Sequence, residues 1–159
     1  MTIAWSRLTQ VRERHKQAAL ENVARERQAS EVRDAQAREA QAQLHERVAA
    51  KTLLWQAAAR GEASFSIAQL GQTSAWSRAL DVQIAQAAQA ARQALLQAAQ
   101  QQQVLAASRH RLRAALGELD RAQQMQRRAD SERRRQRELR ADDAAEEAAS
   151  QAWAARRGA

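Results

Sequence analysis

The sequence contains no cysteine, no proline and only four glycines, and aromatic residues make up 3% of its 159 positions. Without cysteine, neither a disulfide framework nor a thiolate metal site can form. Because glycine and proline are the residues that interrupt helices, their scarcity allows very long ones. Alanine, glutamine and arginine dominate instead, and glutamate is also common; all four are favourable in helices. The composition therefore predicts long helices with a thin core rather than a compact globule.

Long apolar runs are also missing. No stretch approaches the ~20 apolar residues that a bilayer span requires. The first residues, MTIAWSRLTQVRERHK, reach a charged side chain at Arg7 and lack the apolar run of a cleavable secretion signal. We therefore expect a soluble, cytoplasmic protein with no direct membrane insertion.

The residues that break helices gather only in RGEASFSIAQLGQTSA, residues 60–75. Gly61 can end a helix, and Thr73 or Ser74 can cap the next one. We predict an all-α protein with helices over 2–59 and 74–157 and a connecting loop over 60–73. Within the loop, ASFSIAQL is expected to form a short helical turn. This turn would bury Phe65, Ile67 and Leu70.

The second predicted helix carries a 4-3 repeat from Leu80 to Ala129, and a repeat of this kind is typical of a coiled-coil seam. Twelve of its fifteen positions are apolar. The polar exceptions are Gln101, Ser108 and Gln126. The first helix has a weaker pattern whose frame slips. Its candidate apolar positions are Leu8, Val11, Leu20, Val23, Ala37, Leu44, Val48 and Trp55.

Two long helices and a short connection predict an antiparallel coiled-coil hairpin. If the hairpin closes near residue 66, residue i faces roughly residue 132 − i. The first helix, which begins near residue 2, then pairs with the second helix only as far as about position 130. The 4-3 repeat also stops there. At 1.5 Å per residue the helices would be on the order of 85 Å and 125 Å long. We therefore expect the second, longer helix to project beyond the first.

The tryptophans fall near the two ends of this hairpin. Trp55 and Trp76 are about equally far from the turn, so they either lock the tip together with Phe65 or contact a partner there. Trp5 and Trp153 lie near the chain ends. Because Trp153 falls on the projecting helix, it has little core available and is a candidate partner contact.

Residues that carry chemistry are not arranged as a catalytic site. His15, His45 and His110 are far apart, the glycines are isolated, and a two-helix hairpin is expected to have no concave pocket. We therefore expect a protein that is not an enzyme, with no catalytic residue, cofactor, metal site or small-molecule substrate.

The segment RRADSERRRQRELRADDAAEEAA, residues 127–149, is basic and then acidic. Three interpretations remain open: a solvated helix face with its own i, i+4 ion pairs, a docking surface for a protein, and a nonspecific phosphate-binding surface. Interleaved acids, the acidic block that follows and the lack of an aromatic residue for base stacking disfavour nucleic acid. Binding to a membrane surface is disfavoured because no bulky apolar face underlies the arginines.

The chain resembles a family of small coiled-coil proteins, the stalk proteins of bacterial type III secretion and flagellar export (the FliJ/YscO group). The resemblance lies in the size, the hairpin with a longer second helix, and the ending LGELDRAQQMQRRADSERRRQRELRADDAAEEAASQAWAARR. In that family a basic helix leads to an acidic pair, then to small residues and an aromatic. The corresponding residues here are Arg137, Glu138, Asp142, Asp143 and Trp153. The alanine- and glutamine-rich middle and the poor seam of the first helix depart from the family pattern.

The resemblance implies a central stalk whose paired termini insert into a hexameric secretion ATPase and whose loop side reaches the export gate. It also implies a place beside an inner-membrane secretion apparatus, and contact with chaperones of secreted subunits. The expected residues on the ATPase side are Trp5, Arg133, Arg134, Arg137, Glu138, Asp142, Asp143 and Trp153. Those expected on the loop side are Trp55, Phe65 and Trp76. The alternatives are a generic coiled-coil scaffold or chaperone-like protein and, less favoured, an arginine-rich nucleic-acid binder.

Overall fold

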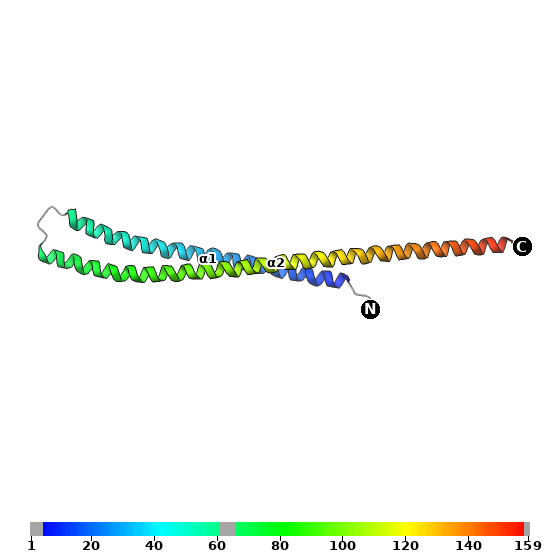
Figure 1. Ribbon diagram of the computed structural model, residues 1–159, viewed down its shortest axis with the longest axis horizontal. Coiled ribbons are helices and arrows are strands. Elements are labelled where there is room, and N and C mark those ends of the chain that lie inside the picture. The colour runs from blue at the N-terminus through cyan, green and yellow to red at the C-terminus, as the bar shows by residue number, and fades with distance from the viewer. Residues whose placement is uncertain (1–4, 61–65, 158–159) are drawn as a thin grey trace. The chain divides into compact units, whose positions relative to one another are not determined.

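The computed structural model describes residues 5–60 and 66–157, and these form two long α-helices (Figure 1). Helix α1 spans Trp5–Arg60, with 56 residues, and helix α2 spans Ile67–Arg157, with 91 residues. The predicted all-α class with a longer second helix is confirmed. Within the described ranges, neither helix has a segment long and apolar enough to cross a membrane.

Contacts divide the chain into two units, which we treat separately. The inner unit comprises residues 21–110, and the terminal unit comprises residues 1–20 and 111–159. In each unit a segment of α1 lies beside a segment of α2 (Figure 1). Each unit is therefore a helical pair with its own seam.

The helices of the inner unit run antiparallel. Lys51 forms an ion pair with Asp81, and Trp55 donates a hydrogen bond from Nε1 to Ser77 Oγ at 3.2 Å. A step of four residues forward in α1 is thus a step of four residues backward in α2. Both pairs obey the relation expected from the sequence, in which residue i faces residue 132 − i.

Helix α2 begins earlier than predicted, at Ile67 rather than at residue 74. Ser66 caps it in a reciprocal arrangement: the Gln69 backbone N–H donates to Ser66 Oγ at 3.2 Å, and the Ser66 N–H donates to Gln69 Oε1 at 3.1 Å. This is a capping box, which satisfies backbone groups at a helix start. Thr73 and Ser74, the predicted caps, therefore lie inside the helix. Gly61 and Phe65 fall outside the described residues.

The predicted seam of α2 faces the partner helix at every position. In the inner unit, Ala91, Ala98, Leu105 and Ser108 are buried, and the other seam positions between Leu80 and Gln101 are half-buried. In the terminal unit, Leu119 and Ala122 are buried, and the remaining seam positions from Leu112 to Ala129 are half-buried. The repeat also extends backward, because Thr73 is half-buried and Ser77 is buried. The coiled-coil interpretation of α2 is confirmed.

Helix α1 uses charged and polar side chains where apolar ones were expected. Val11, Leu20, Val48 and Trp55, four of the predicted seam residues, are exposed. The inward-facing positions include Arg12, Lys16, Glu26, Ser30, Asp34 and Lys51, all buried or half-buried. Long charged side chains can cover a seam with their aliphatic stems while their heads reach water. The other four predicted seam residues, Leu8, Val23, Ala37 and Leu44, are buried or half-buried. Apolar periodicity therefore found only part of this face.

Candidate functional site

The C-terminal segment of α2, residues 131–157, has no partner helix among the described residues of the terminal unit. Thr9 Oγ1 hydrogen-bonds to Gln126 Oε1 at 2.8 Å, so pairing with the start of α1 extends at least this far. Ala129 is half-buried, and every residue from Asp130 to Arg157 is exposed. The second helix thus continues past the pair, as the sequence predicted (Figure 1).

The 4-3 repeat also stops supplying apolar residues there. If the 4-3 repeat is continued beyond Ala129, its next positions are occupied by Arg133, Gln136, Arg140, Asp143 and Glu147. None of these five can supply an apolar knob to a facing helix. A second α-helix would therefore gain little by packing along this line.

The predicted ATPase-side residues are all described by the structure. Six of them lie within the C-terminal segment and are exposed, and their side chains make no hydrogen bond or ion pair in the described structure. These six are Arg133, Arg134, Arg137, Glu138, Asp142 and Asp143. The i, i+4 ion pairs of the solvated-face interpretation are thus not formed here. The charged groups stay available to another molecule.

Trp153 is held by a neighbour that the sequence analysis missed. The guanidinium carbon of Arg157 lies 4.1 Å from the centroid of the Trp153 ring, a cation–π contact. Trp153 is nevertheless 58% exposed, and Leu139 on the same segment is 55% exposed. The i, i+4 spacing of Trp153 and Arg157 was the available signal for this contact. The segment therefore offers two large apolar side chains among its charges.

Trp5 lies apart from these residues, at the start of α1. Its backbone carbonyl accepts a hydrogen bond from Thr9 Oγ1 at 3.0 Å, and Thr9 in turn contacts Gln126. Trp5 is half-buried, whereas the other ATPase-side candidates are exposed. The structure thus groups seven of the eight predicted residues on one segment and places Trp5 beside the last turns of the helical pair.

Two of the loop-side candidates, Trp55 and Trp76, lie within the described residues. Trp55 donates a hydrogen bond to Ser77, and Trp76 is 68% exposed. Ile67 and Leu70, which were predicted to be buried, are 90% and 50% exposed. The prediction was wrong because α2 is already formed at these residues and leaves both side chains exposed. Phe65 lies outside the described residues.

This end of the inner unit is poor in charge. From Thr52 to Ser77, the described residues include a single charged side chain, Arg60, although 28% of the whole chain is charged. Trp76, Ile67 and Leu53 are the most exposed of its large apolar residues. Depletion of charge around exposed aromatic and aliphatic groups is typical of the core of a protein interface.

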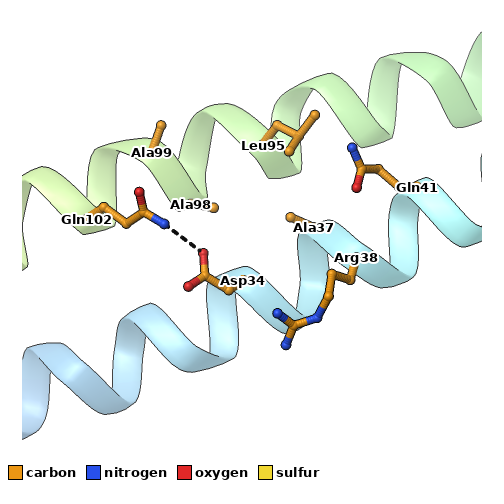
Figure 2. A pocket seen from close by; sticks show the side chains of 8 residues that line it. All are labelled: Asp34, Ala37, Arg38, Gln41, Leu95, Ala98, Ala99 and Gln102. Carbon is orange, nitrogen blue, oxygen red and sulfur yellow. Dashed lines mark hydrogen bonds between the residues drawn. The ribbon is translucent and has the colours of Figure 1, made fainter.

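A groove in the inner unit contradicts the expectation that a two-helix hairpin has no concave surface. It has a volume of about 450 Å³, and it lies between α1 and α2 (Figure 2). Its lining residues are Asp34, Ala37, Arg38, Gln41, Leu95, Ala98, Ala99 and Gln102. At one end Gln102 donates a hydrogen bond to the Asp34 carboxylate at 3.3 Å. The groove arises because alanines face each other where bulkier residues would fill the space.

The described residues contain no group of three or more histidine, aspartate or glutamate side chains that could hold a metal ion. His15, His45 and His110 are all exposed. Three surfaces stand out by their exposure or shape: the C-terminal segment, the apolar loop-side end and the alanine groove.

The sequence matches no protein-family model, and it has no significant match among curated proteins or solved structures.

Proposed function

We propose that this protein is a non-enzymatic central stalk or adaptor of a bacterial type III secretion apparatus. In this role its termini dock into a hexameric secretion ATPase, and its loop side contacts the export gate. It would act in the cytoplasm, peripheral to the inner-membrane apparatus. Chaperones of secreted subunits are further proposed partners. The proposal rests on the resemblance described above and on the surfaces of the two helical pairs.

The observation that carries the proposal is the continuous exposure of residues 131–157 on a helix that has lost its partner. A lone helix of this length offers charges in all directions, which suits the polar inner wall of a ring. Its basic side chains, such as Arg134 and Arg137, precede an acidic block that includes Asp142 and Asp143. Complementary patches of both signs would set the register of docking and speed the encounter more than they would raise affinity.

The loop-side end supports the second contact of an adaptor. Its exposed Trp76 and Ile67 are apolar, whereas the C-terminal segment is charged. Two surfaces of such different chemistry fit two different partners. A linking protein needs two separate contacts, and an apolar surface in the inner unit and a charged surface in the terminal unit would supply them.

The proposal is tested by pull-down of the secretion ATPase from the same organism and by its ATP hydrolysis rate with and without this protein. We expect association and a changed rate. The double variant Arg134→Glu/Arg137→Glu should keep the helix content and weaken association. The control Arg109→Glu/Arg113→Glu makes the same change in net charge at exposed positions of α2 outside the segment, and it should bind normally.

If the wild-type protein neither associates with the ATPase nor alters its rate, the stalk function is wrong and a generic coiled-coil scaffold is favoured. The nucleic-acid alternative is tested by retention on DNA at about 0.2 M salt, since phosphate contacts weaken steeply with salt.

A further inference from the structure

The outer surface of the middle of α2 is poor in charge. Between Val82 and Ser108, the one charged residue is Arg92, whereas charged residues recur throughout the facing stretch of α1, residues 24–50. Four large apolar side chains are exposed on this part of α2. They are Val82 at 58%, Leu95 at 44%, Leu96 at 64% and Val104 at 45%. Apolar exposure without charge marks this surface as an interface candidate.

One stripe of this surface runs along the alanine groove. It consists of Ala88, Arg92, Leu95, Ala99, Gln102 and Ala106. These positions follow a 4-3 spacing, which keeps them on one face of the helix. Each of them comes one residue after a position of the seam with α1. Leu95, Ala99 and Gln102 line the groove directly, next to Ala37 of α1. Figure 2 shows Gln41 at one end of the groove, the Gln102–Asp34 hydrogen bond at the other, and Leu95 between them.

The stripe is complementary to the same stripe of a second copy that runs in the opposite direction. If a second copy of α2 is laid antiparallel about an axis level with Gln97, Leu95 faces Ala99 of the second copy, and Ala88 faces its Ala106. A leucine thus meets an alanine on both sides of the axis, so that each knob enters the groove of the other copy. A two-fold interface requires this kind of self-complementarity.

The same alignment matches charge. Arg92 then faces Gln102 of the second copy, whose side chain is hydrogen-bonded to Asp34. The guanidinium of one copy would therefore lie next to a carboxylate of the other, twice in the symmetric pair. Two chains of net charge +8 repel each other over most of their surface. The repulsion is lower at this face, because Arg92, the only basic side chain of the α2 stripe, is provided with an acid. Arg38 of α1 also lines the groove.

We propose that two copies of this protein associate through the α2 face formed by Arg92, Leu95, Ala99 and Gln102, as an antiparallel pair with two-fold symmetry. This interface is separate from the C-terminal segment, and it does not depend on the proposed stalk function. Alanine at the contact points allows the two helices to approach closely, as in 4-3 packing of antiparallel helices.

Analytical ultracentrifugation of the full-length protein tests the proposal. The wild type should sediment with about twice the monomer mass of 17.7 kDa at concentrations on the order of 100 µM. Leu95→Glu should weaken association by at least about tenfold, because it places a charge in the groove. The matched control Val32→Glu, at an exposed position of α1 outside the groove, should leave the dimer intact. Circular dichroism checks that all variants keep the same helix content.

A charge exchange gives the sharper test. Arg92→Asp and Asp34→Arg should each weaken the dimer, and the double variant should restore it, because the pair is re-formed with reversed sign. A wild type that remains monomeric at this concentration would overturn the proposal, as would a dimer that Leu95→Glu leaves unchanged. The proposal would also be overturned if the double variant dimerised no more strongly than either single variant.

Discussion

The Gln101 side chain donates a hydrogen bond of 2.6 Å to a carboxylate oxygen of Glu26 and reaches the Glu26 backbone carbonyl at 3.4 Å. Gln101 is a polar exception in the apolar repeat of α2, and Glu26 occupies the facing seam position of α1. Both are half-buried. Two interruptions that look like defects in the separate helices therefore become one specific contact. A polar pair of this kind fixes register, because sliding either helix leaves both groups without their partner.

Replacing Gln101 by leucine should therefore destabilise the inner unit. The Glu26 carboxylate loses a donor while it remains half-buried, which costs about 1–2 kcal/mol in the free energy of unfolding. Urea denaturation measures this loss. Gln103→Leu, at an exposed position of the same helix, serves as the control and should change stability by less than about 0.5 kcal/mol. If Gln101→Leu is as stable as the wild type, the Gln101–Glu26 pair does not fix the register of the helices.

Leu105 is the largest buried side chain of the inner unit. It is 8% exposed, and the other buried residues of that unit are alanines and serines. Leu105→Ala should lower the free energy of unfolding by about 2–3 kcal/mol, through lost burial and a residual cavity. The neighbouring Val104→Ala removes a side chain that is 45% exposed and should have a much smaller effect. Equal effects of the two variants in urea denaturation would contradict the assignment of the seam.

The sequence predicted α2 far better than α1, for a physical reason. The inward face of α2 is built from Leu, Ile and Ala, so apolar periodicity locates it. In α1 the inward face includes Arg12 and Lys16, whose aliphatic stems cover the seam, and hydropathy counts them as surface residues. The start of α2 was missed because Gly71 was taken as a loop residue, whereas the S-x-x-Q capping box at Ser66 was the stronger signal.

For the candidate site, position along the chain was more informative than residue type. The end of the repeat at Ala129 located the unpaired segment, and the observed pairs Lys51–Asp81 and Trp55–Ser77 obey the 132 − i relation. The alanine groove could not be predicted. It depends on the register in which Ala37 faces Ala98, and that register is set by the polar α1 seam.

Leu112→Pro should disrupt the helical pair of the terminal unit. Proline removes one backbone hydrogen bond and clashes with the preceding turn, at a cost of about 3 kcal/mol or more. We expect reduced ellipticity and a lower thermal midpoint. Leu139→Pro, in the C-terminal segment, should also reduce ellipticity but leave the thermal midpoint of the pair nearly unchanged, since Leu139 packs against no partner helix. Retained helicity and midpoint in Leu112→Pro would contradict the seam in this part of α2.

Removal of residues 131–159 separates folding from docking. All described residues in this range are exposed, so their deletion should leave the apolar burial of the helical pair and its urea midpoint unchanged. The same truncation should abolish association with the secretion ATPase, because it deletes seven of the eight proposed contact residues. A truncated chain that still binds the ATPase would place the docking surface elsewhere. A truncated chain with a lower urea midpoint would show that the C-terminal segment contributes to the fold.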